Sequence, residues 1–442
     1  MLNEAESRQL VAKVIALANK TAGAEAVVSL RSARTGNTRF AVNEITSSGD
    51  VDTQDLSVTL KFGKRSASAS TNQLDDRSLA DVVARAARMA KISPENPESM
   101  SPLGKQTYKQ VKGARDLATA KLGPEPRAKA AGASIALATS SKVTIAGYYE
   151  HADRTRALAS TSGMSAFHAW TSANMTCTAR TPDGTGSGWA GGASHRIGDF
   201  DASALAKIAV EKGVKSAKAA KLDPGRYTVV LEPAAVTDLL DFLTSSFNAR
   251  RADEGRSFFS KPGGGTRIGE KLFPDTITLR TDPTDPQLGT PPFDGSGFAI
   301  GPTTWIDKGV VKGLVYDRYW AQKQGKQATG QPQGWILDGG KATREELIKG
   351  VKRGVLITRF WYLRWIDPQT ILITGLTRDG VFLIENGEIT RPVNNFRFNE
   401  SPVQMLAKCD GLTPSMVSPM GGMRVPALRT HEFNLASISE AV

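Results

Sequence analysis

The tripeptide Asp223-Pro224-Gly225, near the middle of the chain, is the feature that most constrains the fold. Adjacent proline and glycine interrupt regular structure and mark a turn. Segment 226–231 then predicts a strand, and Pro233 predicts the start of a helix, because the first helical turn tolerates a missing N–H. Apolar residues follow at helical spacing, namely Val236, Leu239, Leu240, Leu243 and Phe247. Since 442 residues exceed what one core supports, we expect two domains, residues 1–222 and 223–442.

The N-terminal part combines helical and strand signals. Apolar periodicity predicts helices over residues 5–20, 78–90, 125–131 and 202–217. Strands are expected over residues 26–30, 38–42, 56–62, 143–149, 156–160, 165–179 and 186–193. Gly36-Asn37 and Gly49-Asp50 predict turns, and the polar residues 93–124 predict a long loop. Together these signals indicate a mixed domain of helices and sheet with a strand-rich central part.

The C-terminal part is dominated by strand signals after its first helix. Residues 371–374 and 381–384 are expected to form a hairpin that turns at Arg378-Asp379-Gly380. A second turn is expected at Asn386-Gly387. The fold class predicted for the whole chain is therefore α+β, with an N-terminal mixed domain and a C-terminal β-rich domain that carries a covering helix.

Composition limits the classes of function. The formal net charge is +12, but the basic residues are dispersed and no zinc-finger or RRM motif is present, so nucleic acid is not expected as the primary ligand. Two cysteines, Cys177 and Cys409, are too few for a disulfide framework and favour a reducing compartment. No long apolar run predicts a membrane span, and the first residues lack the shape of a signal peptide. We expect a cytoplasmic protein with no membrane partner.

An ordered set of short motifs resembles the TldD/PmbA family. In the second half these are Tyr-Thr-Val-Val-Leu-Glu-Pro at 227–233, Arg-Ser-Phe-Phe at 256–259, Gly-Glu-Lys at 269–271, Ile-Thr-Leu at 277–279, Phe-Asp-Gly-Ser-Gly at 293–297, Trp-Ile-Asp-Lys-Gly-Val-Val at 305–311, Ala-Thr-Gly at 328–330, Asn-Phe-Arg-Phe-Asn-Glu-Ser-Pro at 395–402 and Val-Pro-Ala-Leu at 425–428. In the first half they are Arg-Phe-Ala-Val-Asn-Glu-Ile at 39–45 and Leu-Ser-Val at 56–58. The resemblance covers most of the chain and is weakest over residues 93–140. It implies the same α+β fold.

The resemblance also implies a zinc motif that this chain lacks. Family members called TldD carry His-Glu-x-x-x-His on the helix after the strand; the histidines bind zinc and the glutamate polarises the zinc-bound water. The matching positions here are Asp241, Phe242 and Ser246. A phenyl ring accepts no proton, and one carboxylate with one hydroxyl makes a poor zinc site. The chain therefore resembles the TldE/PmbA members, which lack the motif, and we assign it no metal ligand and no cofactor of its own.

Other polar residues leave alternatives open. The four histidines, His151, His168, His195 and His431, form no pair at helical spacing, although His168 and His195 could meet across strands. The resemblance also implies that catalytic members have a cysteine ligand near the C-terminal end of the chain. A single cysteine such as Cys409 more often contributes only to packing. Asp238 and Asp241 lie three apart on the predicted helix, so they are either an acid–base pair or two exposed carboxylates.

Glycine-rich and aromatic segments are also ambiguous. Gly263-Gly264-Gly265 lacks the Walker lysine and predicts a mobile loop, but the resemblance places this stretch near the cavity and makes the three glycines candidate substrate contacts. Ser296 lacks the Gly-x-Ser-x-Gly setting of a hydrolase. The aromatic residues of the second half predict a core or a subunit interface, and they are Trp305, Tyr316, Tyr319, Trp320, Trp335, Phe360, Trp361, Tyr362 and Trp365. Strand alternation places Phe360 and Tyr362 on one face and Trp361 on the other.

The resemblance and the missing motif together predict a non-catalytic, TldE-like subunit of a TldD/TldE-type metallopeptidase. A TldD-like partner would supply the zinc, and the heterodimer would cleave unfolded or leader peptides inside a closed cavity. An extended peptide would be added as a strand to a sheet edge. Two alternatives remain open. One is a stand-alone binding or regulatory protein, of the nucleic-acid or gyrase-modulator type, and the other is a homodimeric hydrolase that uses Asp238, Asp241 or His168.

Overall fold

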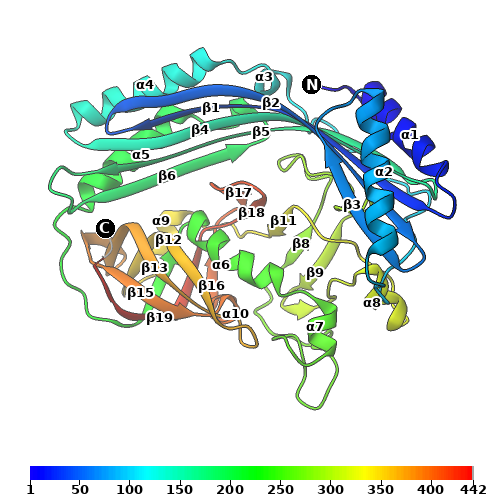
Figure 1. The fold of residues 1–442 in the computed structure, drawn as a ribbon. Coiled ribbons are helices and arrows are strands. Elements are labelled where there is room, and N and C mark those ends of the chain that lie inside the picture. Colours follow the sequence, from blue (N-terminus) through cyan, green and yellow to red (C-terminus); the bar gives the residue numbers. More distant parts are fainter. Residues whose placement is uncertain (441–442) are drawn as a thin grey trace.

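The N-terminal part is built on a long antiparallel sheet that arches over the rest of the chain (Figure 1). The computed structural model describes residues 1–440. Six strands lie in the order β3-β2-β1-β4-β5-β6, with bounds β1 Glu25–Ala41, β2 Glu44–Phe62, β3 Arg65–Thr71, β4 Thr144–Ser160, β5 Ser165–Arg180 and β6 Ser187–Ser194. The helices of this part are α1 Glu4–Asn19, α2 Asp76–Ile92, α3 Leu117–Ala120, α4 Pro124–Ser140 and α5 Ala202–Lys215, with a 3₁₀ turn at Ile197–Asp199.

The helices bury one face of this sheet. In α2, Asp75 caps the first turn by accepting a hydrogen bond from the Ser78 amide, which satisfies a donor that the helix leaves free. Apolar residues of α2 such as Leu79 and Val82 are fully buried and join Val58 and Leu60 of β2 in one cluster. Each large aliphatic side chain buried in this way contributes roughly 1.5–3 kcal/mol. The other face of the sheet is directed at the C-terminal part (Figure 1).

The C-terminal part contains two further sheets. One has the order β12-β7-β19-β15-β13-β14, and because β12 also pairs with β13 its five inner strands close into a ring. The bounds are β7 Gly225–Leu231, β12 Arg353–Asp367, β13 Leu372–Glu385, β14 Glu388–Pro392, β15 Asn395–Glu400, β16 Cys409–Leu412, which pairs with β19, and β19 Leu428–Ser439. The other sheet has the order β10-β9-β8-β11-β18-β17, with bounds β8 Leu279–Thr281, β9 Thr303–Asp307, β10 Val310–Val311, β11 Trp335–Leu337, β17 Met416–Val417 and β18 Met423–Val425. The helices are α6 Pro233–Ser245, α7 Ala249–Asp253, α8 Arg318–Lys323, α9 Arg344–Lys349 and α10 Pro402–Ala407.

The predicted α+β fold is confirmed, and several local predictions are wrong. Gly36-Asn37 and Gly49-Asp50 are not turns, because β1 and β2 pair through them and the chain reverses at Val42-Asn43 instead. The segments 143–149 and 156–160 belong to one strand, β4. The helix predicted over 125–131 continues to Ser140. In each case pairing or packing with distant elements overrides the local turn signal.

The predicted hairpin at Arg378-Asp379-Gly380 is a bulge inside the continuous strand β13. Arg359 pairs with Arg378 and Ile357 pairs with Val381, so two residues of β13 lie opposite one residue of β12. Asp379 and Gly380 both have positive φ, 57° and 119°. Aspartate followed by glycine correctly indicated a bend in the backbone, but the bend is a bulge and not a hairpin turn. A bulge changes the direction of the side chains beside it.

A buried polar cluster links β1, β2, β4 and α4. The Arg127 side chain is fully buried, and its Nη2 donates to Asp50 Oδ1 at 2.9 Å. Arg127 Nη1 lies 3.1 Å from His151 Nδ1. Burial, followed by the charge of Arg127, lowers the pKa of His151. Gly36 makes room for this cluster, because a Cβ there would lie 2.1 Å from Asp50 Oδ1 and 2.3 Å from Arg127 Nη1.

Replacing Gly36 by alanine should therefore lower the free energy of unfolding by about 1–3 kcal/mol. The buried guanidinium of Arg127 has no solvent to move into, so the added methyl group must displace the cluster. The matched control is Gly132→Ala in α4, where a Cβ meets no atom within 4 Å. That variant should gain about 0.5–1 kcal/mol through helix propensity. Urea unfolding of both variants is the measurement, and equal stability would contradict the prediction.

Polar contacts, some of them largely buried, hold the two parts together. Glu232, just before α6, accepts from Lys212 of α5 at 2.5 Å and from Arg344 of α9 at 3.1 Å. Ser187 of β6 donates to Asp379 of β13 at 2.5 Å. Arg250 of α7 makes two 2.8 Å hydrogen bonds to Glu98. Within residues 1–440, no helix combines the length and the apolar character that crossing a bilayer requires.

Candidate functional site

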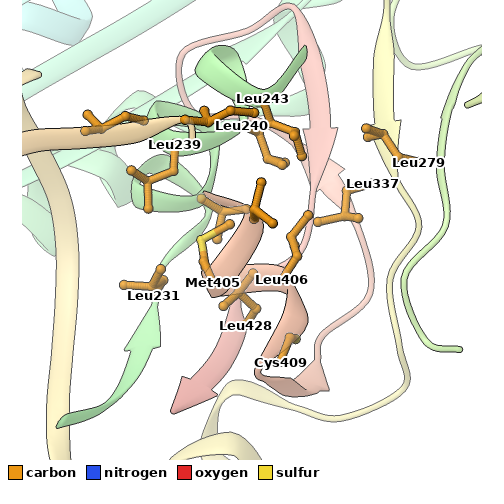
Figure 2. Close-up of a cluster of buried hydrophobic side chains, with 14 of the residues drawn as sticks. Leu231, Leu239, Leu240, Leu243, Leu279, Leu337, Met405, Leu406, Cys409 and Leu428 are labelled. Atoms are coloured by element: carbon orange, nitrogen blue, oxygen red, sulfur yellow. The ribbon is translucent and has the colours of Figure 1, made fainter. Parts of the chain in front are cut away.

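Helix α6 and its C-cap carry Asp241, Phe242 and Ser246, the positions that the resemblance matches to a zinc motif. Leu239, Leu240 and Leu243 bury one side of the helix in the C-terminal core, as Figure 2 shows. Its polar side is directed at β12, where Asp238 Oδ2 accepts a hydrogen bond from the Phe360 amide at 3.0 Å. The helix is therefore fixed by apolar packing on one side and by a buried carboxylate on the other.

Two of the three motif positions are engaged in contacts within the protein. The Phe242 ring packs edge-on against Trp365, with 4.9 Å between ring centroids. Ser246 donates its hydroxyl to the Phe242 carbonyl at 2.8 Å, within its own helix end. Asp241 is exposed and is the only ionisable group of the three. These donors do not fit a zinc ion, which takes nitrogen, sulfur and carboxylate ligands in a tetrahedron.

The histidines lie far from α6. His151 contacts Arg127, and His431 lies between Asp410, at 2.8 Å, and Thr228, at 3.0 Å. Among residues 1–440, no three histidine, cysteine, aspartate or glutamate side chains gather where they could hold a metal ion.

His168 and His195 do not meet each other, but both contact one loop. His168 Nε2 lies 3.2 Å from the Gly289 carbonyl, and His195 Nδ1 lies 3.3 Å from the Gln287 carbonyl. Their contacts join the arched sheet to the C-terminal part. The residues of the predicted hydrolase are therefore divided, with His168 on β5 and Asp238 and Asp241 on α6.

Both cysteines are buried. Cys409 lies beside Leu406 and Leu428 in the core (Figure 2), and burial raises its pKa to about 11. Burial also raises the pKa of Cys177 to about 12. Both thiols are therefore protonated at neutral pH and suit packing better than metal binding or nucleophilic attack.

The carboxyl pair on α6 is perturbed, as an acid–base pair would be. Burial raises the pKa of Asp238 to about 6, against the stabilising effects of the Phe360 amide and of Arg359, and the charge of Asp241 adds to the rise. Asp241 is open to solvent, yet the protein around it displaces enough water to raise its pKa as well. Asp238 already accepts a hydrogen bond from the backbone of β12. A structural role, holding α6 against that strand, therefore explains the position of its carboxylate.

The predicted glycine contacts lie on an exposed loop. Gly263, Gly264 and Gly265 all have positive φ, and a Cβ at any of them would meet no atom within 4 Å. The loop is closed by the Lys261 amide, which donates to the Gly265 carbonyl at 2.9 Å. Its role as a peptide contact stays a prediction.

The aromatic residues divide into a core set and a surface set. Trp305, Tyr316, Trp320 and Trp335 are buried, and so is Phe360. The expected alternation after Phe360 is wrong, because Tyr362 has φ 59° in an irregular stretch of β12 and is 63% exposed. Four exposed residues of this stretch, which we call the aromatic patch, are Trp361, Tyr362, Trp365 and Ile366. The patch lies beside Phe242, at the motif positions of α6.

A cleft of about 720 Å³ between the arched sheet and the β12–β13 ribbon was not predicted. We call it the arginine cleft, because it is lined by Arg39, Arg180, Arg359 and Arg378 together with Tyr148, Trp189, Trp361 and Asp379. The run Arg-Phe-Trp at 359–361 was a usable signal, since alternation sends Arg359 and Trp361 to the face opposite the buried Phe360. What no local pattern showed is that β4, β5 and β6 lie over that face.

The fold defines a class of protein, an α+β chain in which a long antiparallel sheet arches over a β-rich C-terminal part. Sequence models of the PmbA/TldA metallopeptidases match nearly the whole chain, with domain 1 at residues 26–90, the central domain at 97–217 and the C-terminal domain at 224–437. The chain belongs to this PmbA/TldD metallopeptidase family, as the ordered motifs indicated.

Relatives and solved structures agree with this assignment. A metalloprotease of Methanothermobacter thermautotrophicus is 24% identical over 48% of this chain and 48% of its own length. A metalloprotease PmbA homolog of Buchnera aphidicola is 30% identical over 28% of each chain, so these alignments span half or less of the relatives. The crystal structure of TldE from Thermococcus kodakarensis superposes with a TM-score of 0.86 at 20% identity, and covers 96% of this chain and 99% of that one. At this identity the superposition shows a shared fold.

The raised pKa of Asp238 predicts a pH-dependent cost to stability. A carboxyl group that holds its proton more tightly when folded stabilises the fold below pH about 3.8, and this contribution is lost as the pH rises through about 6. Asp238→Asn keeps the acceptor for the Phe360 amide and removes the charge. Relative to the wild type, this variant should therefore gain roughly 2–3 kcal/mol between pH 4 and pH 8.

Urea unfolding at both pH values is the measurement, and Asp241→Asn is the control. Its effect should be smaller, because the Asp241 carboxylate is exposed. Parallel changes in the wild type and Asp238→Asn would contradict the assigned pKa.

Proposed function

We propose that this chain is a non-catalytic, TldE-like subunit of a TldD/TldE-type zinc metallopeptidase. The observation that carries the proposal is the state of α6, where Asp241, Phe242 and Ser246 replace two zinc ligands and a general base. Phe242 is packed against Trp365 and Ser246 is bonded to its own helix. Hydrolysis then requires a partner that holds the metal, and a TldD-like member with His-Glu-x-x-x-His is that partner.

The aromatic patch supports a subunit contact at this place. Trp361, Tyr362, Trp365 and Ile366 are between 41% and 63% exposed and lie next to the altered motif positions. Aromatic side chains left exposed together are costly in water and are typical of protein interfaces. A partner seated here would lie close to α6 and cover the patch.

The substrate in this proposal is an extended peptide. The heterodimer would enclose unfolded or leader peptides in the cytoplasm, and this chain would contribute the walls of the cavity. A sheet edge offers unpaired N–H and C=O groups to such a peptide. Strand β6, at the edge of the arched sheet, carries Trp189 in the arginine cleft. The glycines at 263–265 are a further proposed contact.

Co-expression with a family member that carries the zinc motif tests the proposal. The two chains should co-purify, and the pair should cleave unfolded peptides while neither chain does so alone. Adding a chelator should stop the cleavage. If the isolated chain cleaved peptides in the presence of the chelator, the proposal would be overturned.

Charged substitutions in the aromatic patch should separate the two chains. Tyr362→Asp and Ile366→Asp place a carboxylate where the partner would bury the patch, so co-purification and cleavage should fall by tenfold or more, about the effect of leaving a charge unpaired at an interface. The matched control is Ile92→Asp at the end of α2, where Ile92 is 84% exposed. Unchanged assembly in all three variants would place the interface elsewhere.

A further inference from the structure

Arginine side chains gather in the arginine cleft. Arg39, Arg180, Arg359 and Arg378 line it, and Asp379 is the carboxylate among its described lining residues. The cleft is formed by side chains from β1, β4, β5, β6, β12 and β13, so it exists only when the two parts of the chain are joined.

Arg359 lies in a stack of alternating rings and guanidinium groups. Its guanidinium carbon is 4.8 Å from the Trp189 ring centroid and 5.1 Å from that of Trp361. Arg378 lies 5.0 Å from the Trp361 ring centroid. Such cation–π contacts hold the flat guanidinium in one orientation, so that binding a ligand costs little side-chain entropy.

Within the described part of the chain, the Arg359 guanidinium donates no hydrogen bond to a protein acceptor. The side chain is only 14% exposed, and among residues 1–440 its nearest carboxylate oxygen, Asp379 Oδ2, is 3.9 Å from Nε. That distance is too long for a hydrogen bond. A largely buried guanidinium without an acceptor is unfavourable unless a ligand supplies one.

A neighbouring cleft provides the contrast. It has a volume of about 440 Å³ and is lined by Arg154 and Arg156. Arg154 donates to Ser172 Oγ at 2.5 Å, and Arg156 donates to the Gly295 carbonyl at 2.8 Å. Those arginines therefore serve the protein structure, whereas Arg359 is left available.

The bulge in β13 explains why Asp379 forms a long ion pair with Arg359 but no hydrogen bond. The Asp379 side chain is 3% exposed, and its Oδ1 accepts the Ser187 hydroxyl at 2.5 Å. Held in this way, the carboxylate stays 3.9 Å from Arg359 and 3.7 Å from Arg378. It orients Arg359 without accepting a hydrogen bond from it, which leaves the donors of Arg359 for a ligand.

We propose that the arginine cleft binds a carboxylate group of an extended peptide, with Arg359 as the principal donor and the flanking indole rings as its walls. This inference rests on the proposed function for the peptide nature of the ligand. Arginine presents paired N–H groups whose geometry matches a carboxylate. The carboxylate belongs either to an acidic side chain or to the C-terminus of the peptide, and the cleft gives the subunit a preference for acidic substrates.

Isothermal titration calorimetry on the full chain tests this with three short glycine/serine-based peptides. The first has a central glutamate and an amidated C-terminus, the second has glutamine instead, and the third has glutamine with a free C-terminus. The glutamate peptide should bind about tenfold or more tightly than the amidated glutamine peptide, the difference expected for a hydrogen bond to a charged group. Tight binding of the third peptide also supports the cleft and assigns the carboxylate to the C-terminus.

Two variants with opposite expected effects separate binding from damage to the fold. Arg359→Gln should abolish the preference for the carboxylate. Asp379→Asn keeps an acceptor for Ser187 at a positive φ that asparagine tolerates, and by removing a like charge it should strengthen binding roughly threefold. Arg88→Gln, at an exposed site on α2, is the charge-matched control and should change nothing.

Several results would overturn the inference. The proposal fails if Arg359→Gln keeps the preference, if both cleft variants weaken binding equally, or if an oligothymidylate of similar length binds more tightly than the glutamate peptide. Cleavage of the glutamine peptide by the complex with a zinc-bearing partner is measured separately. Cleavage without a carboxylate preference refutes the cleft alone, and carboxylate-dependent binding without any cleavage refutes the proposed function alone.

Discussion

In antiparallel strands, alternate side chains lie on opposite faces of the sheet. The long sheet of β1–β6 therefore has two faces that each need packing partners. Small and aliphatic residues such as Val28, Leu60 and Ala179 occupy the outer face and are sealed by helices. The inner face carries polar and aromatic residues, among them Tyr148 and Trp189. Such a face cannot merge with the C-terminal core without burying unpaired polar groups. The two parts therefore meet through selected contacts, and clefts remain between them.

Helix α6 is held in place independently of the three positions that the resemblance matches to a zinc motif. Helix α6 is held by its leucines and by the bond from Asp238 to the Phe360 amide, and neither contact involves the motif positions. Those positions are free to change without loss of the fold. In this chain they hold a carboxylate, a phenyl ring and a hydroxyl, and the phenyl ring of Phe242 extends the aromatic surface of β12.

Elements with strong local periodicity could be predicted from the sequence, and those defined by distant pairing could not. The strand 226–231 and the helix after Pro233 follow from spacing alone, and the structure places them within a residue or two. Gly36 was wrongly expected in a turn. A side chain at this position would collide with Arg127 and His151, which are about a hundred positions away in the sequence, so no local pattern could show why a glycine is needed. Asp379-Gly380 was expected in a hairpin because a bulge and a turn use the same backbone angles.

The candidate site divides in the same way. Asp241, Phe242 and Ser246 could be singled out from the sequence because they are close together in the chain, and their interpretation as an altered zinc motif stays a prediction. The arginine cleft was not, because Arg39, Trp189 and Arg359 come together only through the arch of one sheet over another. Tyr362 shows a further limit, because one left-handed residue was enough to break the alternation on which its predicted face depended.

The position of β7 has a consequence for how the chain reaches this structure. β7 lies between β12 and β19, so its neighbours are made more than a hundred and about two hundred residues after it. During synthesis the arched sheet has all its strands once residue 194 has emerged, whereas β7 waits for residues 428–439. Over that interval its apolar edges are open to wrong partners, which makes slow assembly and dependence on chaperones a property of the C-terminal part rather than of the whole chain.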